Sequence, residues 1–414
     1  MLPDSKSVRM IWITPKFPLG TPDGARLATR SLVRQLTQRQ VQMDLICLVP
    51  DGEEAEGGLA QKELGVRQCS IIRRSRSKFF PLPRWTIPFT FRSFAASRVR
   101  RSLDEEIVRL LESAPSHERT YIVFDGLHTF AALQTDLPTL TARCSGLIYR
   151  AHNVEAVLWE QCALRARTPW MRWFFQYQAH LVRDFESQIA RQVHVIAPVS
   201  EEDGQKFERL ATGARVSVTR IGMDFPDAQD VSRVGDQATF ELLFLGRLDW
   251  LPNREGIQWF LNRVWPALVK TRPQTVLKIA GIGDGRWLER FADLPNLQIL
   301  GRVDHVEPLY QSAALCIAPL FQGSGTRVKI IESARYMRGV MTTALGAEGT
   351  GLLPGVSYIR AETEAEWLQG LQSLSLGACR RVGFEAFQSI RQRFDGGVIA
   401  GELLHSLTGA GAPS

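Results

Sequence analysis

Short apolar segments alternate with helical patterns along this chain, and the alternation occurs twice. In the first half, β-prone apolar runs separated by helical patterns lie at residues 8–13, 43–49, 121–124, 146–149 and 193–199. The pattern restarts later, with apolar runs at 240–245, 276–280, 315–318 and 340–343. Such alternation is typical of parallel sheets covered by helices on both faces. The sequence therefore predicts an α/β fold of two Rossmann-like, doubly wound domains facing each other across a cleft.

The domain boundary is expected in the polar stretch 226–239, which has no periodic pattern. A length of 414 residues also favours two domains. We expect one domain over 1–230, a second over 231–390, and a C-terminal helix over 391–414 that crosses back to the first domain. The other expected elements are a strand at 215–219 and helices at about 24–39, after Ser200, at 253–270 and up to about 337.

Composition and charge exclude several classes of protein. The 50 Lys and Arg exceed the 43 Asp and Glu by only seven, which disfavours a dedicated nucleic-acid binder. The six cysteines lie far apart without a Cys/His cluster, so we expect neither a zinc site nor a disulfide framework. No run reaches the roughly 20 apolar residues that a membrane-spanning helix needs. We expect a cytoplasmic protein, with peripheral binding at the inner face of the membrane as an open alternative.

The most informative segment of the second half is a glycine-rich loop that leads into a helix. The loop consists of Gly323, Ser324, Gly325 and Thr326. Its glycines let the backbone approach a ligand, and the following helix N-terminus offers unpaired N–H groups to an anion. Arg327 and Lys329 add cationic donors, and the Glu332 carboxylate suits a vicinal diol such as that of ribose. The segment predicts a nucleotide site, and an ordinary turn before a charged helix remains the alternative.

A second segment places Gly246 and Arg247 directly after the strand expected at 240–245. The side chain of Arg247 would project at the carboxyl end of the sheet. A guanidinium suits a diphosphate because its planar fork donates two parallel hydrogen bonds. An ordinary surface arginine would explain this position equally well if it stood alone.

Together and in this order, these segments and Gly281-Ile-Gly-Asp-Gly285 resemble the C-terminal domain of retaining GT-B glycosyltransferases of family GT4, in its GSGTR-type bacterial subset. The resemblance covers about 240–349, and the N-terminal half fits the same architecture. It implies transfer of a sugar, with retention, from a UDP- or GDP-sugar to an acceptor hydroxyl. The pathway implied is bacterial cell-surface polysaccharide or glycolipid synthesis. No metal or other cofactor is implied.

The resemblance also implies roles for single residues. Glu332 matches the second Glu of the family's E-x7-E motif, which binds the nucleotide ribose, and Arg247 matches the diphosphate-binding arginine. The chain departs from the family pattern at Ser324, where the first Glu is expected, and at Pro252, where a Lys is expected. Backbone N–H groups of 323–326 are the candidates to take over the contact of the Glu that is absent at Ser324. Lys329 and Arg327 are the candidates to supply the missing cation.

Two positions in the N-terminal half complete the candidate site. Gly24 follows the first strand and matches a flexible glycine that family members keep near the donor diphosphate and the acceptor. A plain turn is its alternative explanation. His152 stands just after the strand expected at 146–149, in a run that resembles the HN-x-E signature of related bacterial enzymes. The matching His lies near the reacting sugar, so we expect His152 to face the cleft. A structural histidine is the alternative.

The segment 64–103 contains ten Lys or Arg, no Asp or Glu, and six interleaved aromatic residues. Basic and aromatic residues together are typical of contact with an anionic membrane or a lipid-linked acceptor. A nucleic-acid surface, which the modest net charge disfavours, and a segment with core aromatics remain as alternatives. The aromatic helix expected at 170–183 has a spacing that fits simple packing.

Two other functions stay open from the residues alone. One is a nucleotide-sugar epimerase or phosphorylase on the same fold. The other is a non-catalytic protein that binds nucleotide sugars or polyanions, which the substitution at Ser324 allows.

Overall fold

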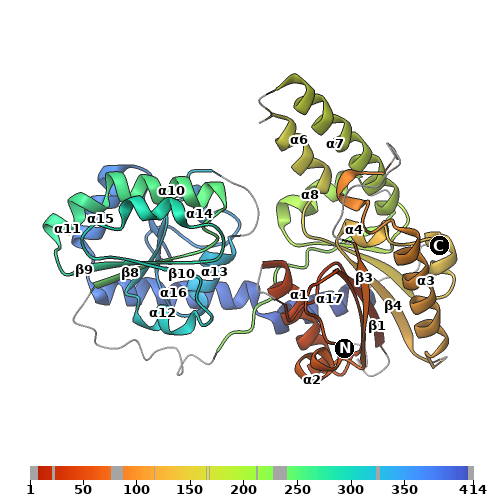
Figure 1. Ribbon diagram of the computed structural model, residues 1–414. Coiled ribbons are helices and arrows are strands. Elements are labelled where there is room, and N and C mark those ends of the chain that lie inside the picture. Colours follow the sequence, from red (N-terminus) through yellow and green to blue (C-terminus); the bar gives the residue numbers. More distant parts are fainter. Residues whose placement is uncertain are drawn as a thin grey trace. The chain divides into compact units, whose positions relative to one another are not determined.

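The computed structural model describes residues 8–20, 24–75, 87–115, 117–164, 166, 168–210, 213–226, 240–322 and 327–408. The chain divides into two compact units (Figure 1). Unit 1 comprises Met1–Asp224 together with Gly396–Ser414, and unit 2 comprises Phe225–Asp395. Of the stretch expected to link the halves, 227–239 lies outside the described residues.

Unit 1 is built on a parallel sheet of order β3-β2-β1-β4-β5-β6-β7. Its strands are β1 (Val8–Thr14), β2 (Gln42–Pro50), β3 (Gln68–Arg74), β4 (Arg119–Asp125), β5 (Gly146–Ala151), β6 (Val195–Pro198) and β7 (Arg215–Val216). All seven residues of β1 are buried, because helices cover both faces of the sheet. This double burial explains why the central strands read as nearly continuous apolar runs.

The helices of unit 1 lie on both faces of this sheet (Figure 1). They are α1 (Gly24–Gln38), α2 (Gly57–Leu64), η2 (Phe89–Phe91), α3 (Ser97–Glu112), α4 (Leu127–Phe130), α5 (Leu137–Thr141), α6 (Glu155–Leu164), α7 (Pro169–Ala190), α8 (Glu201–Leu210) and α17 (Gly396–Thr408). Ser200 caps α8, since its Oγ accepts a hydrogen bond from the N–H of Asp203 at 3.1 Å.

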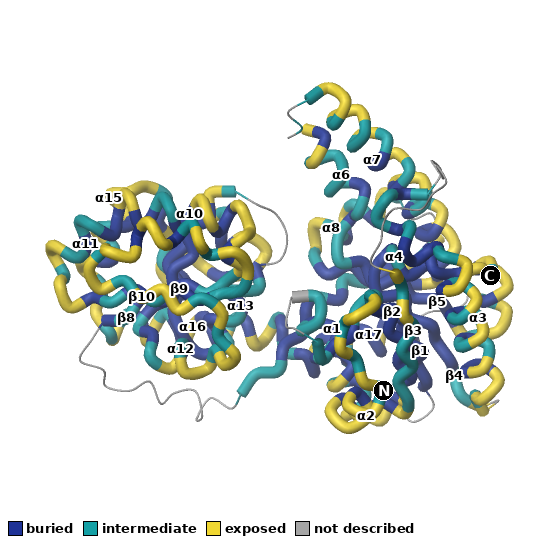
Figure 2. The backbone as a smooth tube through the Cα atoms, in the orientation of Figure 1, coloured by how far each residue is buried: buried dark blue, intermediate teal, exposed yellow. Residues whose placement is uncertain are grey.

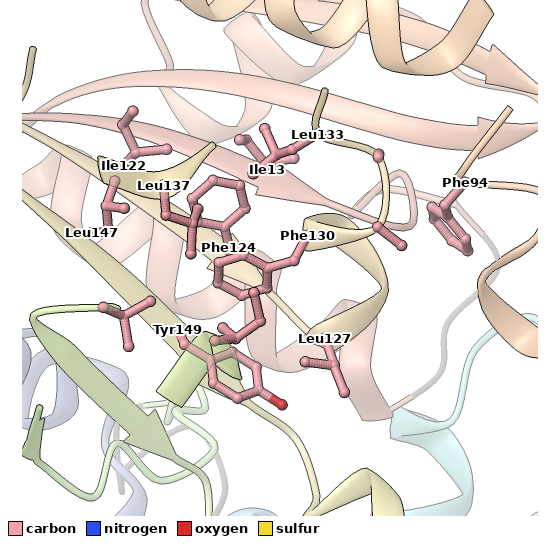
Figure 3. Close-up of a cluster of buried hydrophobic side chains, with 14 of the residues drawn as sticks. Ile13, Phe94, Ile122, Phe124, Leu127, Phe130, Leu133, Leu137, Leu147 and Tyr149 are labelled. Atoms are coloured by element: carbon pink, nitrogen blue, oxygen red, sulfur yellow. The ribbon is translucent and has the colours of Figure 1, made fainter. Parts of the chain in front are cut away.

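Side chains that alternate along β1 enter two separate cores. Ile11 and Ile13 belong to the core shown in Figure 3, which also contains Phe124 and Tyr149. Trp12 belongs to the opposite core, which includes Ile399 of α17. The C-terminal helix therefore completes the core of unit 1.

Unit 2 has a six-stranded parallel sheet of order β10-β9-β8-β11-β12-β13. The strands are β8 (Phe240–Leu245), β9 (Thr275–Ala280), β10 (Leu297–Gly301), β11 (Leu315–Ala318), β12 (Val340–Thr342) and β13 (Ile359–Arg360). The helices are α10 (Leu251–Arg263), α11 (Trp265–Thr271), η3 (Arg286–Phe291), α12 (Glu307–Ser312), α13 (Val328–Arg335), α14 (Ala344–Ala347), α15 (Glu364–Ser373) and α16 (Leu376–Phe394). None of the described helices is long and apolar enough to cross a membrane.

Several element predictions were wrong in detail. The helix expected at 253–270 is two helices, α10 and α11, which meet at Val264 because Pro266 cannot continue the hydrogen bonding of α10. The strand expected at 215–219 is only two residues long. Strands β3 and β10 and the two-residue strand β13 were missed. Strand β3 lies inside the cationic segment, and the middle of β10 is exposed, so neither has the apolar pattern of a central strand.

Candidate functional site

In unit 2, the loops after β8 and β9 touch at the carboxyl edge of the sheet. The N–H of Gly246 donates to the carbonyl of Ala280 at 3.2 Å, and the N–H of Leu248 donates to the carbonyl of Ile282 at 2.8 Å. A Cβ on Gly281 would lie 1.7 Å from the carbonyl oxygen of Gly246, so only glycine allows this approach. The Gly246-Arg247 segment after β8 and the glycine-rich segment 281–285 after β9 are thus packed against each other.

Arg247 projects from this edge and is 60% exposed. Its guanidinium donates to both carboxylate oxygens of Asp249, with Nε–Oδ1 at 3.0 Å and Nη2–Oδ2 at 2.6 Å. This hydrogen bonding lowers the pKa of Asp249. An exposed ion pair of this kind is weak, so a diphosphate can compete with Asp249 for the guanidinium.

Lys329, in the first turn of α13, lies beside the β8 loop. Its ammonium donates to Oδ1 of Asn253 and lies 4.8 Å from the centre of the Phe244 ring. Asn253 is buried and in turn donates from Nδ2 to the carbonyl of Arg247 at 2.7 Å. Asn253 thus connects the Lys329 ammonium to the backbone of Arg247, whereas the guanidinium of Arg247 bonds to Asp249. Burial lowers the pKa of Lys329 to about 7, and the charge of Arg327 adds to this effect.

Arg327 is buried, with its Nε donating to the carbonyl of Leu345 at 3.2 Å and its Nη2 lying 3.8 Å from Glu348. Lys329, the other candidate for the missing family cation, shares a hydrogen-bonded network with the β8 loop through Asn253. Pro252, where the family lysine was expected, is buried in the first turn of α10. The loop residues 323–326 lie outside the described residues.

The Glu332 carboxylate lies on α13 and accepts a hydrogen bond from the hydroxyl of Tyr310 at 3.1 Å. Burial raises the pKa of Glu332, although the Tyr310 hydrogen bond and the charge of Arg335 act in the opposite direction. The ring of Tyr310 stacks on that of Tyr336, with the centroids 4.6 Å apart. Tyr310 is a site neighbour that sequence reasoning missed, because a single tyrosine in a short helix carries no motif.

In unit 1, His152 follows β5 and contacts Asp125 at the end of the neighbouring strand β4. The His152 Nε2 lies 2.7 Å from Asp125 Oδ1. The same carboxylate accepts hydrogen bonds from Arg150 at 2.9 Å, Thr29 at 2.6 Å and Trp12 at 3.2 Å. His152 is half-buried, whereas Asp125 and Arg150 are almost completely buried. Parallel strands end at one edge, which brings these residues together.

Burial alone would raise the pKa of Asp125, but the charges of Arg150 and His152 outweigh it and hold the pKa well below its usual range. An ionised carboxylate only accepts hydrogen bonds, so Nε2 of His152 is the donor. In the neutral ring Nδ1 is then left as an acceptor. Sequence reasoning found His152 but missed Asp125, because its neighbours are distant in the chain.

The last residue of the HN-x-E run, Glu155, begins α6 beside a second buried carboxylate. Glu186 of α7 accepts hydrogen bonds from the Tyr149 hydroxyl at 2.9 Å and from the N–H of Glu155 at 3.2 Å. Burial raises the pKa of Glu186 to about 8 and that of Glu155 to about 7. Glu186 therefore anchors α7 to the start of α6.

Gly24 is the first residue of α1, the helix that also carries Thr29 and hence contacts Asp125. The loop residues 21–23 just before it lie outside the described residues. Helix α1, which begins at Gly24, and His152 therefore both contact Asp125 at the same edge of the unit 1 sheet.

The described parts of segment 64–103 are largely structural. Phe91 and Phe94 are buried in a core of unit 1, and the guanidinium of Arg74 lies 4.1 Å above the Phe94 ring. Arg67 pairs with the buried carboxylate of Asp44 at 2.9 Å. Within the described residues, the alternative of core aromatics thus applies to Phe91 and Phe94. Residues 76–86 lie outside the described part.

A mostly apolar pocket of about 280 Å³ lies elsewhere in unit 1, between the segment after residue 86, the α4–α5 region and α7. None of the single residues predicted for the donor or the reacting sugar lines it, but Ile87, Pro88, Phe91 and Arg100 of segment 64–103 do. Among the described residues there is no group of three or more side chains arranged to hold a metal ion.

The chain is similar to known proteins both in sequence and in fold. Residues 239–374 match the family model described as glycosyl transferases group 1. Over 164 residues the chain is 26% identical to an "uncharacterized 44.6 kDa protein in cps region" of Klebsiella pneumoniae. That match covers 37% of this chain and 42% of the Klebsiella protein, which is less than half of either.

Two solved structures are similar over nearly the whole chain. Anabaena HepE, solved in complex with UDP and glucose, has a TM-score of 0.61 and 14% identity, and the match covers 97% of this chain and 99% of that one. Sucrose-phosphate synthase from Thermosynechococcus elongatus has a TM-score of 0.64 and 14% identity, covering 95% and 96%. The predicted GT-B fold of two Rossmann-like domains is therefore confirmed. The family match and this fold support a glycosyltransferase.

Proposed function

We propose that the protein is a retaining hexosyltransferase of the GT4 type, which transfers a sugar from a nucleotide-diphosphate sugar to an acceptor hydroxyl. The single observation that carries the proposal is the network of Lys329, Asn253 and Arg247 at the carboxyl edge of the unit 2 sheet. It lies within the residues that match group 1 glycosyltransferases.

The proposed chemistry depends on where charge develops. As the glycosidic bond breaks, negative charge grows on the departing diphosphate. Lys329, which is held by Asn253, and the exposed guanidinium of Arg247 stabilise that charge, and such donors act most strongly in the transition state. The N–H groups of loop 323–326 add to this stabilisation, and Gly246 lets the diphosphate approach the backbone. These groups can neutralise the diphosphate without a resident metal.

In unit 1, His152 is proposed to contact the reacting sugar near Gly24. The Asp125 carboxylate accepts a hydrogen bond from Nε2–H and fixes the ring, so Nδ1 can accept a hydrogen bond from a sugar hydroxyl. We assign residues 1–230 to a domain that binds the acceptor and 231–390 to a domain that binds the donor. Residues 391–414 are assigned to a helix that crosses back to the acceptor domain.

The donor class and pathway are also part of the proposal. Anabaena HepE was solved with UDP-glucose, which supports a UDP-sugar donor, and a GDP-sugar is the second choice. The relative from a cps region supports cell-surface polysaccharide or glycolipid synthesis. We place the protein in the cytoplasm with peripheral membrane contact. Segment 64–103 would contact an anionic membrane or a lipid-linked acceptor. Its exposed described cations include Arg73, Arg98 and Arg101.

The direct test is a thermal-shift screen of UDP, GDP and their sugars, followed by an assay for release of nucleoside diphosphate from the sugar that binds. A ligand of the folded state raises the midpoint of unfolding by mass action. Absence of any shift and of any release would contradict the proposal. Isomerisation of the donor sugar without acceptor would favour an epimerase instead.

Glu332→Ala is expected to weaken binding of the free nucleoside diphosphate roughly tenfold or more, because the ribose would lose a charged hydrogen-bond acceptor. Isothermal titration with UDP measures the change. Glu307→Gln is the matched control, since Glu307 accepts a hydrogen bond from the adjacent Tyr336 at 3.2 Å but has no proposed ligand contact. Equal affinities in the two folded variants would remove Glu332 from the ribose site.

Donor binding is expected to take up protons above neutral pH. The pKa of Lys329 is about 7 before the ligand arrives, and a bound diphosphate raises it by supplying negative charge. Below this pKa the amine is already charged. Above it, each pH unit should lower the affinity for UDP-glucose by up to about tenfold. Titration calorimetry in buffers of different ionisation enthalpy measures the uptake.

Lys329→Met is the control for this measurement, because it removes the titrating amine while keeping an unbranched chain. Its weaker binding should show no proton uptake. If wild type and Lys329→Met take up the same number of protons, another group titrates and the assignment to Lys329 is wrong.

A further inference from the structure

The hairpin formed by α6 and α7 differs from the rest of unit 1 because large apolar side chains are exposed near its end. Figure 1 shows the two helices extending away from the sheet, and Figure 2 shows exposed residues along them. Near the turn, Leu164 is 81% exposed, Trp170 69% and Trp173 60%. These are the most exposed large apolar side chains among the described residues, apart from Leu353. The spacing of the aromatic helix 170–183 fits packing, and Trp173 does stack on Tyr177 with ring centroids 5.8 Å apart, yet both tryptophans stay mostly exposed.

Other aromatic residues of the hairpin do hold it together. Trp159 of α6 contacts Phe175 and Phe174 of α7, with ring centroids 5.9 and 6.4 Å apart. Phe174 also contacts Phe89 at 6.5 Å. The inner face is therefore already occupied by packing partners. The exposed tryptophans are not needed to join the two helices, so their exposure requires another explanation.

The charge of the hairpin end favours one kind of partner. Between residues 161 and 182 the sequence contains three arginines and no Asp or Glu, and Arg172 is exposed between the two tryptophans. Tryptophan rings settle at the boundary between lipid headgroups and acyl chains, and nearby arginines attract anionic headgroups. A leucine beside them can enter the apolar layer. This combination matches the surface of an anionic bilayer.

A second protein chain fits the same surface less well. At these exposures, two tryptophans and one leucine present roughly 400 Å², about half of what one partner contributes to a standard protein interface. The arginines would also repel each other across a symmetric contact of two hairpins. The hairpin end is large enough for shallow insertion into lipid and too small for a stable dimer.

We propose that the α6–α7 hairpin docks unit 1 onto an anionic membrane by inserting Leu164, Trp170 and Trp173 at the headgroup boundary. The hairpin starts at Glu155, three residues after His152, at the carboxyl edge of the unit 1 sheet. Docking therefore brings this edge toward the membrane surface. The proposal concerns a different surface from segment 64–103, and it does not depend on the identity of the donor.

Co-sedimentation with vesicles tests the proposal. Wild type should pellet with vesicles of phosphatidylcholine and phosphatidylglycerol and much less with phosphatidylcholine alone. Trp170→Ser/Trp173→Ser should lower the partition coefficient at least roughly tenfold. Phe384→Ser is the matched control, because Phe384 is 45% exposed on α16 of unit 2, and it should bind as wild type does. UDP should raise the unfolding midpoint of every variant as much as that of wild type. A loss of vesicle binding is then not caused by a loss of donor binding.

A label reports whether the hairpin itself enters the lipid. Cys162 is the exposed one of the six cysteines, and it lies in α6 next to the exposed Leu164. A polarity-sensitive fluorophore on Cys162 should shift to shorter wavelength when anionic vesicles are added. The proposal is overturned if wild type ignores these vesicles, if the double variant binds equally well, or if the label does not shift. It is also overturned if wild type is a dimer that the double substitution dissociates.

Discussion

Asp125→Ala is expected to lower the free energy of unfolding of unit 1 by about 3–5 kcal/mol, because it leaves the charge of Arg150 buried without its counter-ion. Nε and Nη2 of Arg150 already have no hydrogen-bond partner among the described residues. The hydrogen bond from Nη1 to Asp125 is therefore the one that offsets the cost of burying the Arg150 charge. The hydroxyl of Thr29 and the indole N–H of Trp12 would also lose their common acceptor. Urea unfolding followed by circular dichroism measures the loss.

The double variant Asp125→Ala/Arg150→Met tests the cause. Removing both charges should restore much of the stability, since an apolar pair avoids the cost of a buried lone ion. The pH dependence follows from the lowered pKa of Asp125. Its stabilising contribution is complete above the unfolded pKa of about 3.9 and is lost as pH falls toward the folded pKa. A double variant as unstable as Asp125→Ala would show that packing, not charge, is responsible.

Arg247→Ala is expected to lower turnover of the donor about 100- to 1000-fold, because it removes a charge that stabilises the departing diphosphate. Donor affinity should fall much less, since the interaction strengthens toward the transition state. The fold should be unaffected, because the side chain is 60% exposed and its ion pair with Asp249 lies at the surface. Release of nucleoside diphosphate under single-turnover conditions measures the change.

Arg360→Ala is the matched control for this experiment. Arg360 is also a half-exposed arginine at a strand end of the same sheet, paired with an acid two residues later, Glu362, at 2.9 Å. Strand β13, which carries it, lies at the far end of the sheet from β8. Its substitution should leave turnover unchanged. If Arg247→Ala turns over as fast as Arg360→Ala, Arg247 has no role in the reaction.

Much of the fold follows from the sequence, because central strands of a covered parallel sheet must be apolar on both faces. The runs at 8–13 and 240–245 therefore identified the first strand of each sheet. Strand β3 escaped this reasoning, since its residues are only half-buried and include two arginines. The helix break at Val264 could have been inferred from Pro266, whose ring and missing N–H end a helix.

The sequence by itself determined which local motifs are present: a glycine and an arginine after a strand, a lysine and a glutamate on the following helix, and a histidine after β5. Local spacing suffices for these, because each motif lies within one strand–loop–helix unit. Only the tertiary structure decided which distant residues meet them. Asn253 connects Lys329 to the backbone of Arg247, and Asp125 joins His152 to Thr29, 96 residues from Asp125 in the chain. Periodicity likewise indicates an apolar face but not what covers it, so the exposure of Trp170 and Trp173 could be known only from the packing of α7 on α6.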